Sequence, residues 1–408
     1  MGEEVYADCY AMVVLRLIVF DRKENLKNAE HAESERRGRT EYFMSKRVFV
    51  TCDIGAALEV LRQRGYEVEV YPSPEAPSKS LIVEKVKSGI DGLITTLRDK
   101  IDAEIFEAGK GTLKVVSQLA VGFDNINRAD ADRYKIPFTN TPDVLTEATA
   151  EFAFFIMGTL ARKMWPAERL TRENIWGYWH PYLPFLGDEV TGKTIAIIGT
   201  GRIGQAMIKM CSGFDMNILC YTPRRRSDEF VQAIQEVMDL RFARGIQREK
   251  TWIKYVSFDD ALSQADFVSI HVPLVRDGEN PTYHLFDEKA LRKMKSTAFL
   301  INTSRGPVVD ETALAHALKE SWIAGAGLDV YEKEPLPADS PLRDPAIEDR
   351  CRLLPHFASA GKITRLSPDP NKGMAGRCVQ GLIDVLEGNY GGDLIKMPYV
   401  VNKEVFKS

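Results

Sequence analysis

Short apolar runs alternate with amphipathic helical segments through the first part of the chain. The runs 47–52, 66–71 and 91–97 have the apolar or alternating pattern of strands, while "GAALEVLRQRG" (55–65) has helical periodicity and ends at a glycine. The run 113–122 continues the series. Apolar strands separated by helices predict a parallel sheet with helices on both faces. We therefore expect a small doubly wound α/β domain here.

A second α/β series is predicted between residues 193 and 354. Before it, residues 146–164 favour a helix that is long enough to pass from one domain to the next, with Thr146 as the N-cap. A loop rich in aromatic residues and proline follows over 174–190, and residues 373–389 predict a further helix. The pattern indicates two α/β domains.

The composition is that of a globular protein without a broad affinity for polyanions. The chain has 408 residues, of which 44% are hydrophobic and 27% charged, so two domains are expected. The net charge of −4 argues against nucleic acid or membrane partners, and any anion site must be local. The six cysteines are scattered, which disfavours a disulfide framework or a metal site. We expect a cytoplasmic protein with reduced thiols and no metal.

The first 44 residues differ from the rest. The apolar run 11–20 is short and is broken by Arg16, so it fits neither a membrane span nor a secretory signal. Residues 21–39 contain almost no apolar side chains, which is typical of disorder. Because "MSKRVFVT" from Met44 would serve as a start, we expect residues 1–44 to be a dispensable, disordered extension. A targeting or partner-binding arm is the alternative.

A glycine-rich signature predicts a dinucleotide site. In "KTIAIIGTGRIGQAMIKM" an apolar strand leads into Gly199, Gly201 and Gly204, and an amphipathic helix follows. In this GxGxxG spacing the first glycine allows the tight turn, the second lets the backbone approach the pyrophosphate, and the third allows close packing. The N–H groups of Arg202 and Ile203 at the helix start would bind the phosphates.

The turn after the next strand, "CYTPRRRSDEF", indicates which dinucleotide is bound. An NAD site usually places a carboxylate there for the ribose 2′-hydroxyl. This chain instead offers Thr222, Arg224 and Arg226, and guanidinium groups bind a 2′-phosphate well. The sequence thus predicts NADPH, with NADH as a secondary cofactor. A solvated basic turn is the alternative.

Three strand ends supply an acid-base set. The strand in "AFLINTSRG" ends near Arg305, "GAGLDVYEKEP" delivers Asp329 and Glu334, and "LLPHFAS" places His356 after a rigidifying proline. Ligands bind at the carboxyl ends of parallel strands, so these side chains are expected near the nicotinamide. A structural ion pair is the alternative for Arg305 and Glu334. The other histidines indicate mainly structural or surface roles, with a cofactor-side position open for His271 and a substrate contact for His180; the remainder are His31, His284 and His316.

Six ordered motifs resemble those of one enzyme family. They are "VGFDNIN", "TNTPDVLTEATAE", "GTGRIGQA", "INTSRGPVVDE", "GAGLDVYEKEP" and "LPHFAS". Their order and spacing resemble the D-isomer-specific 2-hydroxyacid dehydrogenases over about residues 46–402, and within that family the glyoxylate/hydroxypyruvate reductases. The resemblance implies a Rossmann dinucleotide-binding domain at 147–354, inserted into a flavodoxin-like substrate/catalytic domain formed by 45–146 and 355–408.

The resemblance also assigns roles to residues. It implies that Arg305 binds the substrate carboxylate and keto oxygen, that His356 is the acid-base and that Glu334 is its partner. A neighbouring carboxylate stabilises the imidazolium that must donate a proton. The remaining implied contacts are substrate contacts from Val121, Gly122, Thr96 and Trp179, with Trp179 reaching across a homodimer interface, and nicotinamide contacts from Asp329, Thr303 and Pro273.

The predicted activity is the NADPH-dependent reduction of glyoxylate or hydroxypyruvate to glycolate or D-glycerate. The alternatives are a dehydrogenase of another D-2-hydroxy acid and a dinucleotide-sensing scaffold similar to a corepressor. Three segments depart from the family pattern. They are 357–361 after the histidine, "SPDPNKG" at 367–373, where prolines interrupt a usual helix, and the long basic link 240–256, expected to be a solvated insertion.

Overall fold

The computed structural model describes residues 45–181, 185–223 and 228–407. The chain divides into two units, Met1–Lys46 and Arg47–Ser408, and every element below belongs to the second. Among the helices of the described ranges, none is long and apolar enough to cross a membrane.

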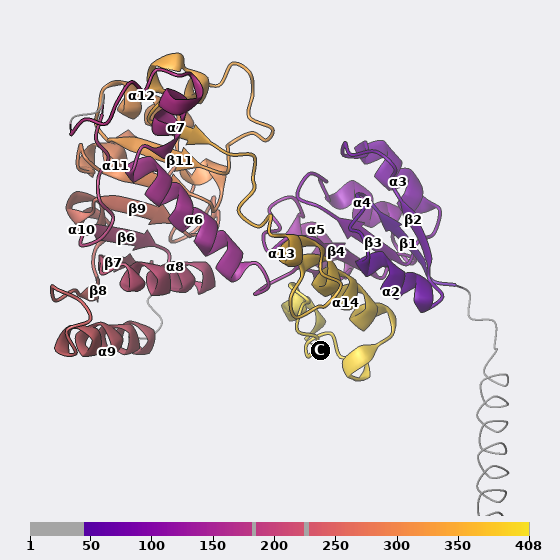
Figure 1. The fold of residues 1–408 in the computed structure, drawn as a ribbon. Coiled ribbons are helices and arrows are strands. Elements are labelled where there is room, and N and C mark those ends of the chain that lie inside the picture. The colour runs from indigo at the N-terminus through magenta and orange to yellow at the C-terminus, as the bar shows by residue number, and fades with distance from the viewer. Residues whose placement is uncertain (1–44, 182–184, 224–227, 408) are drawn as a thin grey trace, which may run out of the picture. The chain divides into compact units, whose positions relative to one another are not determined.

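The first sheet has five parallel strands in the order β2-β1-β3-β4-β5 (Figure 1). Ile82, Ile105 and Ala131 place α3, α4 and α5 in one hydrophobic core, and Leu58 and Leu382 place α2 and α14 in the other. The elements are β1 (Arg47–Val50), α2 (Ala57–Gln63), β2 (Glu67–Val70), α3 (Lys79–Lys87), β3 (Gly92–Thr95), α4 (Ala103–Ala108), β4 (Val115–Gln118), α5 (Arg128–Tyr134), β5 (Phe138–Thr139) and α14 (Met374–Leu386).

The second sheet has seven parallel strands in the order β12-β11-β10-β9-β6-β7-β8, the doubly wound Rossmann order (Figure 1). One core contains α10, α11 and α12, and the other contains α6, α8 and α9. The elements are α6 (Thr146–Ala161), α7 (Met164–Arg172), β6 (Thr194–Ile198), α8 (Arg202–Gly213), β7 (Asn217–Tyr221), α9 (Glu229–Ala243), β8 (Ile253–Tyr255), α10 (Phe258–Gln264), β9 (Phe267–Ile270), α11 (Glu288–Lys293), β10 (Phe299–Asn302), α12 (Glu311–Lys319), β11 (Gly325–Leu328) and β12 (Cys351–Leu353).

The chain returns to the first sheet after the second is complete. The short helix α13 (Lys362–Leu366) leads into α14, and the Ser117 hydroxyl on β4 donates to the Cys378 carbonyl at 2.7 Å. The predicted fold class, two parallel α/β domains with a Rossmann sheet, is therefore confirmed. The domain limits at 147 and 354 stay predictions.

The helix predicted over 146–164 is shorter than expected. It ends at Ala161, and α7 begins separately at Met164, because Lys163 adopts a left-handed backbone with φ of 50°. Thr146 is the first residue of α6 and not its N-cap; Leu145 is in that position and provides no side-chain cap. The predicted helix over 373–389 corresponds to α14, which ends at Leu386.

The basic link 240–256 is more ordered than a solvated insertion. It contains the last turn of α9 and all of the edge strand β8, which pairs with β7. Arg241 on α9 forms an ion pair with Asp215 at 2.6 Å, and Gln247 and Thr251 are buried. The Tyr255 hydroxyl lies 3.3 Å from the Thr200 hydroxyl in the glycine turn, so the link reaches the predicted dinucleotide site.

We predict that the packing of α6 on β11 leaves no room for a side chain at Gly327. A Cβ at Gly327 would lie 2.2 Å from Ile156 Cγ2, so Gly327→Ala should lower the free energy of unfolding by about 1–3 kcal/mol. Gly158→Ala on α6 is the matched control. Its Cβ would meet no described atom within 4 Å, and alanine favours the helix by about 1 kcal/mol. Urea unfolding midpoints test both, and equal midpoints for Gly327→Ala and wild type would contradict the packing described.

Candidate active site

Three adjacent strands deliver the polar residues of the site. In the second sheet β11 lies between β10 and β12, and all three are parallel. Arg305 follows β10, Glu334 follows β11 and His356 follows β12. Because parallel strands end at the same edge of a sheet, these loops meet there although up to 51 positions separate them in the sequence.

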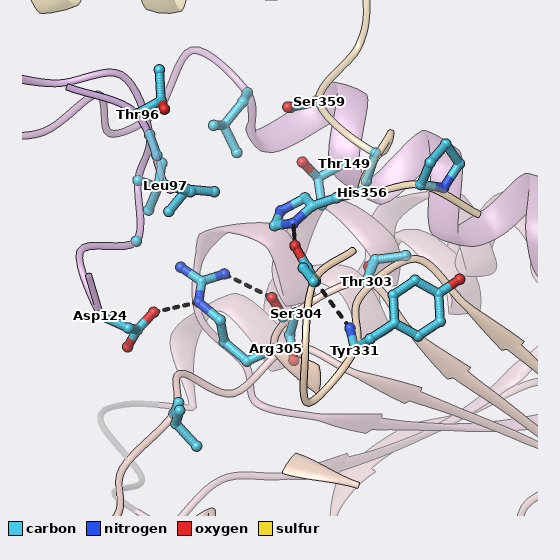
Figure 2. A pocket seen from close by; sticks show the side chains of 18 of the residues that line it. Thr96, Leu97, Asp124, Thr149, Thr303, Ser304, Arg305, Tyr331, His356 and Ser359 are labelled. Atoms are coloured by element: carbon cyan, nitrogen blue, oxygen red, sulfur yellow. Dashed lines mark hydrogen bonds and ion pairs between the residues drawn. The ribbon is translucent and has the colours of Figure 1, made fainter. Parts of the chain in front are cut away.

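His356 and Glu334 form a direct pair. The imidazole Nδ1 lies 2.8 Å from Glu334 Oε2, and Glu334 Oε1 accepts the Tyr331 N–H at 3.1 Å (Figure 2). Burial acts to raise the pKa of Glu334, but the hydrogen bond and charge of His356, together with the Tyr331 N–H and the charge of Arg305, leave the pKa below its ordinary value. An ionised Glu334 accepts the Nδ1 proton, so the imidazole Nε2 remains for a ligand.

The backbone around His356 is held in an uncommon conformation. His356 has φ of 52°, in the left-handed region that non-glycine residues seldom adopt. Its N–H donates to the Asp329 carbonyl at 2.9 Å, and its own carbonyl accepts the Arg365 guanidinium at 2.9 Å. The Asp329 carboxylate accepts the N–H groups of Phe357 and Ala358, both at 2.7 Å. The structure therefore fixes the direction in which the imidazole points.

Asp329 was predicted to contact the nicotinamide. Its side chain is fully buried, both of its oxygens accept the backbone bonds just described, and it is not among the residues that line the cavity. Burial raises the pKa of its carboxyl, against the lowering effect of those two bonds. The geometry gives Asp329 a supporting position behind His356, and a nicotinamide contact stays a prediction.

Arg305 is fixed by contacts on two sides. Its Nε donates to Asp124 Oδ2 at 2.5 Å, and Nη1 donates to the Ser304 carbonyl at 2.7 Å (Figure 2). A Cβ at Gly122 would lie 1.2 Å from Nη2, so a side chain there would displace the guanidinium from this position. Gly306 packs as closely on the Tyr331 backbone, where a Cβ would lie 1.8 Å from the carbonyl carbon. These glycines allow loops from both sheets to meet at Arg305.

A cavity of about 1200 Å³ opens at these loops. Figure 2 shows Thr96, Leu97 and Asp124 on one side, and Arg305 and His356 on the facing side. The structure brings together most of the predicted catalytic and substrate residues. The predicted residues that line the cavity are Thr96, Val121, Gly122, Ile203, Pro273, Thr303, Arg305, Glu334 and His356.

The other predicted residues lie outside this lining. Trp179 is 76% exposed, and Thr222 directly follows β7. Arg202, at the start of α8, forms an ion pair with Asp143 at 2.8 Å. Arg224 and Arg226, the predicted 2′-phosphate ligands, lie outside the described residues.

The glycine turn fits a dinucleotide. Gly199 has φ of 104°, and a Cβ there would lie 2.7 Å from the His271 backbone. A Cβ at Gly204 would lie 2.0 Å from the Gly199 carbonyl oxygen, whereas a Cβ at Gly201 would have no described atom within 4 Å apart from those of its neighbours in the chain. Gly201 therefore leaves open space directly before α8, whose start has no side-chain cap.

The cavity wall adds two observations about a bound cofactor. Thr303 Oγ1 is buried and has no partner among the described residues, which fits a hydroxyl that a ligand must satisfy. Burial lowers the pKa of His271 to about 4, so this wall residue is neutral at physiological pH.

Sequence reasoning missed several lining residues. Asp124 stands within the quoted motif "VGFDNIN", yet the contact with Arg305 spans 181 positions and has no local signal. Thr149 on α6 was assigned only to a helix. The missed lining residues with polar side chains include Asp124, Asn140, Thr149, Ser304, Tyr331 and Arg365.

The Rossmann sheet, the glycine turn and the polar cavity at the strand ends define an oxidoreductase of the dinucleotide-dependent class. The family model "D-isomer specific 2-hydroxyacid dehydrogenase, NAD binding domain" matches residues 154–358. The chain belongs to the D-isomer specific 2-hydroxyacid dehydrogenases, and its cofactor is a nicotinamide dinucleotide.

Named relatives agree with this membership. A glyoxylate reductase of Korarchaeum cryptofilum is 42% identical over 365 residues, covering 89% of this chain and 98% of the relative. The TT0316 protein from Thermus thermophilus is similar in structure, with a TM-score of 0.71, 35% identity and coverage of 87% and 99%. A glyoxylate reductase from Paecilomyes thermophila has a TM-score of 0.70, 26% identity and coverage of 89% and 100%.

Proposed function

We propose that this protein reduces a small 2-keto acid, glyoxylate or hydroxypyruvate, to glycolate or D-glycerate with NADPH. One observation carries the proposal: Arg305, Glu334 and His356 line one cavity, with His356 bonded to Glu334 at 2.8 Å. A cation beside an acid-base pair is what reduction of a keto acid requires, because the carboxylate must be bound and the carbonyl oxygen protonated. The glyoxylate reductases of similar sequence support this substrate class.

His356 is proposed as the proton donor. In the proposed reaction its Nε2 gives a proton to the carbonyl oxygen, while Nδ1 stays bonded to Glu334. The bound cofactor supplies the hydride that reaches the carbonyl carbon, so the products are the 2-hydroxy acid and the oxidised dinucleotide. The ionised Glu334 stabilises the imidazolium before transfer and keeps the ring oriented afterwards.

Arg305 is proposed to bind the substrate carboxylate and to polarise the keto oxygen. With Nε on Asp124 and Nη1 on Ser304, its Nη2 lies at Gly122, where the substrate carboxylate is proposed to bind. The backbone N–H groups of Val121 and Gly122 are proposed to complete this anion site, and Thr96, whose hydroxyl donates to Asp99, is proposed to line it. Fixed donors around a carboxylate hold the keto group in one orientation for hydride transfer.

The cofactor is proposed to lie across the glycine turn with its nicotinamide in the cavity. Gly199, Gly201, Gly204 and the N–H groups of Arg202 and Ile203 would hold the pyrophosphate, and Pro273 and Thr303 the nicotinamide. At the end of β7 the described residues Tyr221, Thr222 and Pro223 offer no carboxylate. This absence supports NADPH, with Thr222, Arg224 and Arg226 as the proposed 2′-phosphate ligands.

We also propose a cytoplasmic homodimer formed by the nucleotide-binding domains. The aromatic loop after α7 exposes Ile175, Trp176, Tyr178 and Trp179, each at least half exposed. A cluster of exposed aromatic and aliphatic side chains is typical of a protein–protein interface. Trp179 is proposed to approach the substrate of the neighbouring subunit.

The activity prediction concerns His356. The purified protein should reduce glyoxylate or hydroxypyruvate with NADPH, and His356→Gln should lower kcat by about 10²–10⁴-fold because the proton donor is lost. His316→Gln is the matched control. That imidazole lies on α12 against Trp322, away from the cavity, so its replacement should leave kcat unchanged. Steady-state absorbance at 340 nm measures all three proteins.

Two outcomes would refute the assignment. A folded sample that binds NADPH but reduces none of glyoxylate, hydroxypyruvate, pyruvate and phosphohydroxypyruvate would favour the sensing scaffold. Undiminished turnover by His356→Gln would remove its role as proton donor. Turnover of pyruvate alone would instead indicate a dehydrogenase of another D-2-hydroxy acid.

The cofactor prediction concerns the arginine turn. Arg224→Ala combined with Arg226→Ala should reduce the preference for NADPH over NADH, as a ratio of kcat/KM, by at least about 10-fold, because charge-assisted bonds to the 2′-phosphate are lost. Arg244→Ala is the control, since Arg244 is an exposed arginine at the end of α9. An unchanged ratio in the double variant would leave the arginines as a solvated turn.

A further inference from the structure

Two loops of the first sheet supply the substrate side of the cavity. One follows β3 and carries Thr96, and the other follows β4 and carries Val121 and Gly122; all three residues line the cavity. Thr96, Val121 and Gly122 lie outside the helices and strands. The hydrogen bonds of the sheet therefore do not fix the orientation of these lining residues. Their relative position must come from contacts between the loops.

Asn125 makes those contacts. Its side-chain Nδ2 donates to the carbonyl of Thr96 at 3.0 Å and to that of Asp99 at 2.8 Å. Its Oδ1 accepts from Gln118 Nε2 at 2.8 Å, at the end of β4. The partly buried amide of Asn125 thus donates both of its protons to the β3 loop and accepts a hydrogen bond from the end of strand β4.

The partners of Asn125 are themselves held by hydrogen bonds. Gln118 is fully buried, accepts the Thr95 hydroxyl at 2.8 Å and approaches the Gly122 carbonyl at 3.4 Å. Asp99 is 2% exposed, and its Oδ2 accepts both the N–H and the hydroxyl of Thr96, at 2.7 and 3.1 Å. A buried network in which most groups are paired holds a single geometry. Asn125 is the residue that joins its two halves.

We propose that Asn125 is a positioning residue for substrate binding. By joining the β3 loop to the β4 loop, it holds the backbone of Val121 and Gly122 in a fixed position as the anion site at Arg305, with Thr96 lining the same cavity. This inference rests on the proposed function for the identity of the anion. It assigns to Asn125 an effect on the 2-keto acid and not on the dinucleotide, because the hydrogen bonds that its side chain makes among the described residues are all with the first domain.

The chain provides a matched control in Asn402. This asparagine is also in the first domain, where it is fully buried, and its Nδ2 donates to the Ile136 carbonyl at 3.2 Å and to Asp132 at 3.0 Å, while Oδ1 accepts the Phe138 N–H at 3.1 Å. It has the same bonding pattern but does not line or join the cavity loops. If Asn125 had only a structural role, the same substitution at Asn125 and at Asn402 would change stability and ligand binding in the same way.

The test compares Asn125→Asp with Asn402→Asp. In Asn125→Asp two donors become an acceptor facing two carbonyls, so KM for glyoxylate and Kd for oxalate, a non-reacting dicarboxylate, should each rise at least about 10-fold. The Kd for NADPH should stay within about twofold of wild type. Asn402→Asp should lower the melting temperature with KM and both Kd values unchanged. Asn125→Ser removes the amide without adding charge and replaces Asn125→Asp in the test if the latter does not fold. It should also raise KM for glyoxylate and Kd for oxalate.

The outcomes separate this inference from the proposed function. Wild-type protein that binds oxalate but reduces no 2-keto acid refutes the proposed function, and the oxalate Kd of the variants still decides the role of Asn125. The inference is overturned if wild type does not bind oxalate, if oxalate Kd is unchanged in Asn125→Ser and Asn125→Asp, or if Asn402→Asp raises it equally.

Discussion

The hydrogen bond between His356 Nδ1 and Glu334 Oε2 is the interaction on which the rest of the site depends. It joins the loops after two neighbouring strands, β11 and β12, and in our proposal it leaves Nε2 for the substrate. His356 has a left-handed backbone where it makes this bond, and three groups hold that backbone: the Asp329 carbonyl, the Asp329 carboxylate and the Arg365 guanidinium. Buried support behind an acid-base residue is how a protein keeps its side chain in one rotamer during proton transfer.

On the facing side of the cavity, a functional side chain is likewise held in place by neighbouring groups. Arg305 comes from the second sheet but is oriented by Asp124 and fitted against Gly122, both from the loop after β4. Asn125, the next residue in that loop, ties it to the loop after β3. Within residues 122–125, Gly122 packs against the guanidinium of Arg305 and Asp124 forms an ion pair with it. Asn125 fixes this loop by its hydrogen bonds to the loop after β3. In our proposal this short segment sets the distance between the bound carboxylate and the proton donor.

Much of this could be predicted from the sequence, and the remainder has physical reasons for being hidden. Apolar runs, the glycine spacing and the strand ends were sufficient for the fold class and for the positions of Arg305, Glu334 and His356. The break after Ala161 was missed because a left-handed Lys163 has no sequence signature. Strand β8 was missed because its three residues carry a lysine between two apolar side chains in a basic segment. Asp124 and the Asn125 network depend on pairing between loops, which local periodicity does not encode.

We propose that one cavity holds the carboxylate of a 2-keto acid between Arg305 and the Val121–Gly122 backbone, with its keto oxygen at His356. A crystal structure of the full chain with NADP⁺ and oxalate would show whether a dicarboxylate binds in this way. We expect one oxalate carboxylate within hydrogen-bond distance of Arg305 and of the backbone N–H of Gly122, and an oxygen of the other carboxylate at His356 Nε2. Oxalate bound elsewhere, or His356 Nε2 turned away from it while Nδ1 has left Glu334, would refute this proposal.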